Sequence, residues 1–176
     1  MYIIAATIDW KAAVRRREDG TLETAFSPDE EDNVFVGDPP EIPESATLYR
    51  GVAEVLTLIR PLLSPTTATE VGSIMENAIN TDYLFPTDLG EADGLEDGTG
   101  TLSPARSEEV SREFQGLRIE ELEAALKSPL VADGLEKLRT YGDEYAIAHL
   151  GSYLNCWREL FAYATKMGAG IVILMG

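Results

Sequence analysis

The chain has 176 residues with 31 Asp and Glu against 14 Lys and Arg, and its formal net charge is −17 at pH 7. A surface of this sign repels phosphate backbones and anionic lipid headgroups, so nucleic acids and membranes are not expected as ligands, whereas a basic protein would be attracted. A single Cys excludes an internal disulfide, and one Cys with one His is too few for a typical zinc site.

The start of the chain, MYIIAATIDW, lacks the basic region of a signal peptide, and no later segment is an apolar run of bilayer length. We therefore expect a cytoplasmic protein, and no motif calls for a cofactor. The acidity is concentrated in the N-terminal part: residues 1–105 contain 20 acids and 6 bases, whereas residues 106–176 contain 11 acids and 8 bases. Such a charge serves solubility, or it speeds association with a cationic partner, and both interpretations stay open.

The N-terminal segment predicts one strand followed by a short helix. Residues 2–8 are apolar and β-prone, which is typical of a buried strand. Asp9 can then cap a helix over residues 10–17, although residues 14–17 and 21–26 could instead form a hairpin around Asp19-Gly20. Both alternatives stay open, with the helix preferred.

The middle of the chain predicts two amphipathic helices between two loops. Residues 27–43 form a Pro-rich loop with a short extended piece at 34–36. One helix begins at Ser45, and its apolar residues recur at helical spacing until Pro61 ends or bends it. A second, shorter helix lies within residues 66–79. The stretch 81–104 has no periodic pattern, and we expect a loop there.

The C-terminal part predicts a series of helices. A helix starts at Pro104, because proline suits the first helical position. Two more cover Ile119–Leu126 and residues 129–139, and Ser128 caps the second of these.

The longest helix starts at Asp143 and ends at Gly168. Gly170–Met175 is apolar throughout and is expected to join the first strand in one sheet. The predicted fold class is therefore α+β: a single compact domain with a small sheet, including the N- and C-terminal strands, covered by α-helices.

The segment LGEADGLEDGTGT at residues 89–101 has the composition of a binding loop, because glycines alternate with Glu91, Asp93, Glu96 and Asp97. Oxygen ligands on such a loop suggest calcium, but Gly100 stands where an EF-hand requires its bidentate Glu. A phosphate cradle is excluded, since GxxxxGK is absent and the carboxylates repel phosphate. A structural loop, a protein-contact loop and a cation site stay as alternatives, so the metal is left unknown.

His149 and Cys156 suggest a nucleophile and its base, but seven helical residues place them about 10 Å apart along the axis. That separation exceeds hydrogen-bond reach, which excludes the dyad. The acidic pairs at predicted helix starts are explained by the helix dipole. The basic run at residues 15–17 is too short to bind nucleic acid. No catalytic residue is therefore assigned.

The C-terminal two thirds resembles a known family. The segment GLEDGTGTLSPARSEEV leads into FQGLRIEELEAAL, and a helix reading ELFAYATKMG ends in the strand IVILMG. This order is similar to the YfbM-like bacterial proteins, a domain family of unknown function. Leu89-Gly90 and residues 102–106 match its Gly-rich loop loosely, and residues 160–174 match its ending, so the resemblance covers mainly residues 84–176. It implies an α+β fold and a bacterial cytoplasmic setting, and it supplies no functional residue.

The sequence therefore predicts a non-enzymatic acidic module that binds a basic protein, for example as an immunity-type or regulatory inhibitor. The partner-binding acids are expected in the two acidic loops: Asp29, Glu30, Glu31, Asp88, Glu91, Asp93, Glu96 and Asp97. The alternative is a small-ligand-binding protein or hydrolase with a carboxylate site near Tyr83, Asp88 and the Gly-rich loop. A homo-oligomer with a structural role is a third interpretation.

Overall fold

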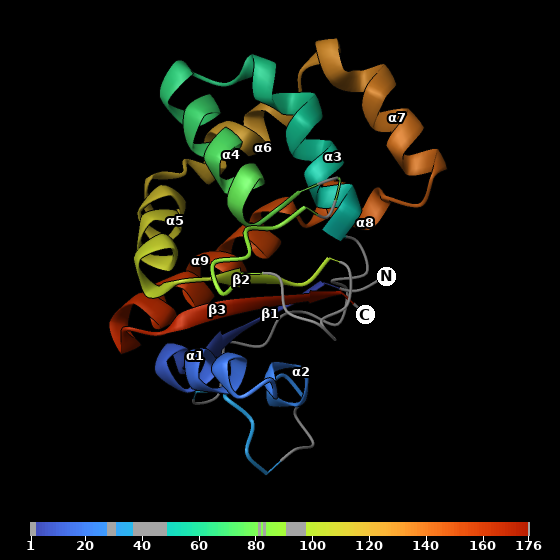
Figure 1. Cartoon of the computed structure of the whole chain (residues 1–176). Helices are drawn as coiled ribbons and strands as arrows, with labels where there is room; N and C mark the ends of the chain where they lie inside the picture. Colours follow the sequence, from blue (N-terminus) through green and yellow to red (C-terminus); the bar gives the residue numbers. More distant parts are fainter. Residues whose placement is uncertain are drawn as a thin grey trace.

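A small antiparallel sheet lies between two layers of helices (Figure 1). The computed structural model describes residues 3–27, 31–36, 49–80, 82, 84–90 and 98–175. In chain order the elements are β1 (Ile3–Ile8), α1 (Trp10–Glu18), α2 (Leu22–Ala25), α3 (Tyr49–Ile59), α4 (Pro65–Asn77), β2 (Gly100–Leu102), α5 (Pro104–Gly116), α6 (Ile119–Leu126), α7 (Ala132–Thr140), α8 (Glu144–Ala148), α9 (Leu150–Met167) and β3 (Gly170–Met175). Short 3₁₀ turns, Arg60–Leu62 and Pro129–Val131, join α3 to α4 and precede α7.

The sheet has the strand order β1-β3-β2, and both pairings are antiparallel. β1 and β3 pair along their whole length, from Ile3 opposite Met175 to Ile8 opposite Gly170. The expected pairing of the first and last strands in an α+β domain is thus confirmed. β2 is a correction to the predicted loop at 81–104, because Gly100–Leu102 pairs with the other edge of β3.

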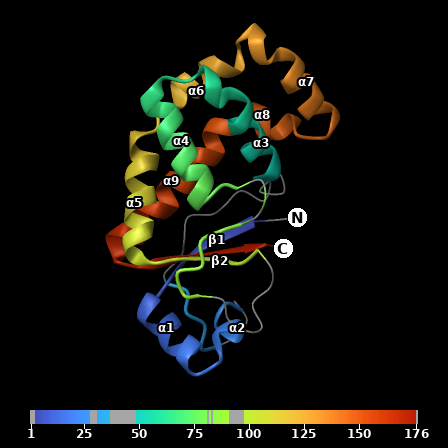
Figure 2. The same cartoon turned by 45° about the horizontal axis from the view of Figure 1, so that its top comes forward.

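The two faces of the sheet carry two separate hydrophobic clusters. Ala5, Leu102 and Ile173 belong to the larger cluster under helices α3 to α9, whereas Ala6 and Val172 belong to the smaller one beside α1 and α2. Figure 2 shows these two layers on opposite sides of the strands. Successive side chains of a strand point to opposite faces, so the central strand β3 must be apolar at every position. This explains the continuous run that identified it in the sequence.

Local contacts decide between the helix and the hairpin after β1. The Asp9 carboxylate accepts a hydrogen bond from the Ala12 N–H at 3.0 Å and caps α1. Three arginines in the last turn are favourable at the negative end of the helix dipole. The preferred helix is confirmed, and the hairpin is wrong. The extended piece at 34–36 is confirmed by a bridge between Phe35 and Ile8.

The long C-terminal helix differs from its prediction, because α8 and α9 are separate. His149 has φ −120° and ψ 19°, so the backbone leaves the helix there. The break lets α8 approach α3 closely: a Cβ on Gly51 would stand 2.5 Å from Asp143 Oδ1 and 3.0 Å from Ala146 Cβ. The end of α9 is as expected, since Gly168 adopts φ 59° in the left-handed region.

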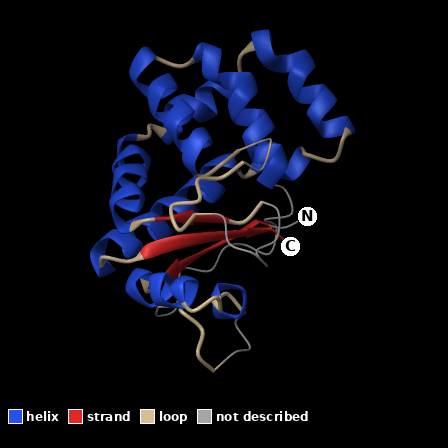
Figure 3. Cartoon of the chain, viewed as in Figure 1, coloured by secondary structure: helices blue, strands red, loops and turns tan. Residues whose placement is uncertain are grey.

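The remaining helices follow the sequence closely (Figure 3). Ser64 precedes α4, and the Ser103 hydroxyl caps α5 by accepting from the Arg106 N–H. The predicted helix at 129–139 is a 3₁₀ turn followed by α7, and Ser128 caps that turn. Residues 45–48, where the first amphipathic helix was expected to begin, lie outside the described residues.

Candidate functional site

The structure places two of the eight predicted partner-binding acids. Glu31 is exposed in a turn after α2, and Asp88 is half-buried in the segment before β2. The following acids lie outside the described residues: Asp29, Glu30, Glu91, Asp93, Glu96 and Asp97. Tyr83, which belongs to the alternative carboxylate site, lies outside them as well.

Asp88 holds the start of α5 against the segment before β2. Its carboxylate accepts hydrogen bonds from Arg106 Nε at 2.9 Å and from the Ser103 N–H at 2.8 Å, and Arg106 Nη2 lies 2.9 Å from Oδ1. Arg106 Nη1 donates to Asn77 Oδ1 at the end of α4. Because one guanidinium joins three segments of the chain, the contacts of Asp88 are structural.

The environment of Asp88 lowers its pKa below the usual 3.8. Burial alone would raise that pKa, but the hydrogen bonds from Arg106 and Ser103, together with the positive charge of Arg106, outweigh it. The carboxylate is therefore ionised at neutral pH. A proton donor for catalysis needs the opposite shift, so the alternative of a hydrolase gains no acid from Asp88.

A second carboxylate cluster joins α4, α5 and α6. Glu121 accepts hydrogen bonds from the Ser64 N–H and from the Thr67 hydroxyl, and these lower its pKa. The pKa of Glu70 is raised by burial and then by the negative charges of Glu113 and Glu121. One oxygen each of Glu70 and Glu113 is buried without a hydrogen-bond partner among the described residues. The cluster therefore loses stability as Glu70 ionises.

Few ion pairs join carboxylates to cationic side chains in the described part of the chain. Two ion pairs join described side chains, Asp88 with Arg106 and Glu136 with Arg139. The second is exposed on α7, where such a pair contributes little to stability. The negative charge of this part of the surface is thus largely not neutralised by ion pairs among the described side chains.

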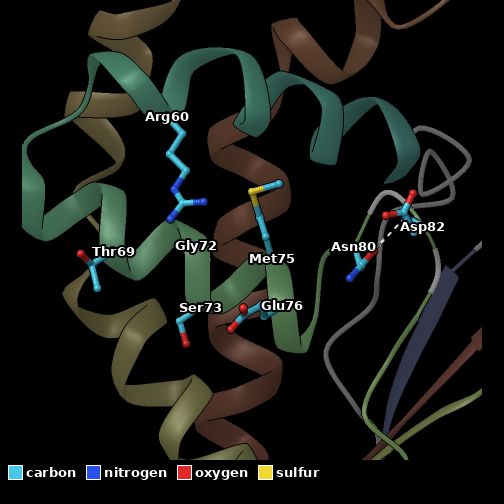
Figure 4. Close-up of a pocket in the computed structure, with 8 residues that line it drawn as sticks. All are labelled: Arg60, Thr69, Gly72, Ser73, Met75, Glu76, Asn80 and Asp82. Atoms are coloured by element: carbon cyan, nitrogen blue, oxygen red, sulfur yellow. Dashed lines mark hydrogen bonds between the residues drawn. The ribbon is translucent and has the colours of Figure 1, made fainter.

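A groove of about 430 Å³ runs along α4 beside the end of α3. Figure 4 shows its lining side chains, which are Arg60, Thr69, Gly72, Ser73, Met75, Glu76, Asn80 and Asp82. Four of them recur at the i, i+3, i+4 and i+7 positions of α4 and so form one face of that helix. An apolar extension of similar volume adjoins it, lined by Thr57, Arg60, Pro61, Ala68 and Met75.

Arg60 is held in this groove by backbone contacts. Its Nε donates to the Ala68 carbonyl at 2.9 Å, and its guanidinium lies against Gly72, where a Cβ would stand 2.3 Å from Nη2. The missing side chain at Gly72 is what makes room for it. Neither Nη1 nor Nη2 donates a hydrogen bond to a described residue, so both remain available to a ligand.

Sequence reasoning missed this groove, because its residues carry no motif and come from the 3₁₀ turn after α3, from α4 and from the segment after α4. The signal that could have indicated it is the isolation of Arg60. No Lys or Arg occurs between it and Arg106, although eight acids do.

No catalytic constellation is present among the residues that the structure describes. Cys156 is half-buried on α9, and burial and the charge of Glu159 raise the pKa of its thiol, which disfavours the reactive thiolate. The His149 ring lies against Tyr145, with ring centroids 4.3 Å apart. The described part of the chain also has no group of three His, Cys, Asp or Glu residues suited to a metal ion.

No family model, no curated protein and no solved structure matches the chain. The described helices include none that combines the length and the apolar character needed to cross a membrane.

Proposed function

We propose that the protein is a non-enzymatic binding module whose acidic surface recognises a basic protein. The observation that carries this proposal is the uncompensated charge: 31 acids face 14 bases, and two ion pairs join side chains within the described part of the chain. Uncompensated charge raises the association rate with an oppositely charged partner and makes it sensitive to salt. Inhibition of a basic enzyme, as by an immunity-type protein, is one concrete form of this function.

The proposal includes the bacterial cytoplasmic setting and the YfbM-like resemblance. The lone Cys156 suits a reducing compartment, and the raised pKa of its thiol keeps it unreactive there. The α+β fold with paired first and last strands is compatible with that resemblance. The partner surface is proposed on the acidic loops, with Asp93, Glu96 and Asp97 as its centre, while Asp88 supports the adjoining segment through Arg106.

Affinity capture with the full chain as bait tests the proposal directly. A lysate of the native organism is passed over the immobilised protein, and bound proteins are eluted with a salt gradient. A stoichiometric basic protein released at moderate ionic strength is expected, because screening weakens surface charge interactions. An eluate without any such protein would overturn the proposed function.

Charge-neutral variants then locate the surface. The variant D93N/E96Q/D97N should associate with the captured partner about tenfold more slowly and with a weaker salt dependence. The matched control D133N/E136Q/E144Q removes the same charge from α7 and α8, where all three acids are exposed. Equal association rates for the two variants would contradict the assignment of the acidic loop.

A further inference from the structure

We propose that the groove along α4 binds a small zwitterion, an ω-amino acid or a short peptide, with its carboxylate on Arg60 and its ammonium group beside Glu76 and Asp82. This inference does not depend on a protein partner, because the groove lies wholly within this chain. It rests on charges of opposite sign that line one groove without pairing.

The carboxylate end of the site is prepared by Arg60. Arg60 is exposed; the contact of its Nε with the Ala68 carbonyl and the close approach to Gly72 orient the guanidinium, while Nη1 and Nη2 donate to no described residue. A guanidinium presents paired N–H groups that match the two oxygens of a carboxylate. Because the protein already holds this group in place, a ligand loses less entropy on binding.

The ammonium end is formed by acids that lack described partners. Glu76 is exposed on α4, and its carboxylate forms no hydrogen bond or ion pair with a described residue. The backbone N–H of Asp82 donates to Asn80 Oδ1 at 2.7 Å, which places Asp82 beside Asn80 in the lining of the groove. Figure 4 shows Met75 between Arg60 and Asn80, with Asp82 beyond Asn80 on the side away from Arg60.

The absence of a direct pair between Arg60 and Glu76 is the informative feature. Both line one groove, yet their charged atoms are not within 4.0 Å of each other. Gly72, under the guanidinium, and Glu76 are four residues apart, which corresponds to about 6 Å along the helix axis. A zwitterion whose two charges are separated by a few bonds bridges that interval, whereas a single small ion cannot.

The charge balance of the groove disfavours ligands with a net negative charge. Arg60 contributes one positive charge, and Glu76 and Asp82 contribute two negative charges, so a phosphate or a dicarboxylate would be repelled. The aliphatic part of the ligand would lie over Met75, and the apolar extension beside Pro61 and Ala68 leaves room for a side chain. The site therefore fits an amino compound with one carboxylate.

Three probes with the same five-carbon chain test the proposal by nitrogen-15 NMR titration of the full protein. They are 5-aminopentanoate, pentanoate, which lacks the ammonium group, and pentylamine, which lacks the carboxylate. The zwitterion is expected to shift the amide signals of α4 in a saturable manner and to bind about tenfold or more tightly than either half-probe. Glycine, diglycine and 6-aminohexanoate then define the preferred spacing.

Matched variants assign the two ends of the site. The substitutions R60Q and E76Q should each weaken the binding of the zwitterion about tenfold, whereas R15Q and E18Q, on α1 across the sheet, should not change it. The variant G72A keeps every charge and favours the helix, but its Cβ displaces the guanidinium of Arg60 and should weaken binding as R60Q does. Because G72A does not lower helix stability, its effect separates a lost site from a lost fold.

Three results would overturn the proposal. The first is the absence of saturable shifts with every member of the probe series. The second is pentanoate or pentylamine binding as tightly as 5-aminopentanoate, which would show a single-charge contact. The third is an equal loss for R15Q and R60Q, which would show a general effect of net charge. Each of these results leaves the proposed recognition of a basic protein standing, since that rests on separate acids.

Discussion

Replacement of Asp88 by Asn removes one charge from the contact that joins α4, α5 and the segment before β2. The asparagine keeps one oxygen that can accept from Ser103 or Arg106, and its amide group faces the Arg106 donors. Hydrogen bonds to charged groups contribute about 1.5–3 kcal/mol each. The Arg106 side chain is 38% exposed, so water compensates part of that loss, and we expect a decrease in the free energy of unfolding of about 1–2 kcal/mol.

Urea denaturation followed by circular dichroism measures this difference. With a urea dependence of about 2 kcal/mol per molar, the D88N midpoint should fall by about 0.5–1 M at pH 7 while the slope stays unchanged. The control E108Q removes an exposed charge from α5, and it should change stability by less than about 0.5 kcal/mol.

The pH dependence of the stability difference between wild type and D88N tests whether the charge of Asp88 is its cause. The pKa of Asp88 is lower in the folded protein than its usual 3.8, so the stability that its charge contributes is present above that value. As the pH falls through the folded pKa, the carboxylate is protonated and the gap between wild type and D88N should close. A gap that is unchanged in acid, or a D88N variant no less stable than E108Q at pH 7, would refute the reasoning.

Three further substitutions have defined outcomes by the same denaturation assay. F161A removes a fully buried ring that packs against Phe114 at 5.3 Å, and it should lower the free energy of unfolding by about 3–5 kcal/mol; a loss below 1 kcal/mol would contradict the core assignment. G168A places a side chain at φ 59°, and it should cost about 1 kcal/mol although the space around it is open, whereas a neutral result would contradict the strain argument. E70Q should raise the urea midpoint at pH 7, because burial and the charge of Glu113 raise the pKa of Glu70 and make its ionised form unfavourable in the folded protein. This gain should vanish below the usual glutamate pKa of 4.5, where Glu70 is protonated in both the folded and the unfolded chain. A gain that persists there would exclude the ionisation of Glu70 as its cause.

The elements predicted well from the sequence are those whose signals are local. α1 follows from the Asp9 cap, and the end of α9 follows from Gly168, since each depends on atoms within a few residues. β3 was recognisable because a strand buried on both faces is apolar throughout. β2, a partner of β3, was harder to predict from the sequence. It has three residues inside a Gly-rich stretch, and it is a strand because it pairs with β3.

The break at His149 and the groove depend on contacts between distant segments. Helical spacing continues from α8 into α9, so the periodicity does not mark the departure, which accompanies the packing of α8 against Gly51. The candidate site has the same origin. The sequence does not indicate a role for Gly72, whereas in the fold its lack of a side chain makes room for the guanidinium of Arg60. Asp88 likewise acquires its partner through the fold, because Arg106 is 18 residues away.

The position of β3 at the centre of the sheet sets the order in which the protein can assemble during synthesis. β1 is made early, yet its hydrogen-bond partner β3 follows every described helix, and Ile8 lies opposite Gly170. Closing so long a loop costs about 3 kcal/mol more than closing a four-residue hairpin, which slows the final step. The edge of β1 that pairs with β3 therefore stays unpaired during synthesis until β3 has left the ribosome. A cell that makes this chain has reason to shield its first residues while the rest emerges.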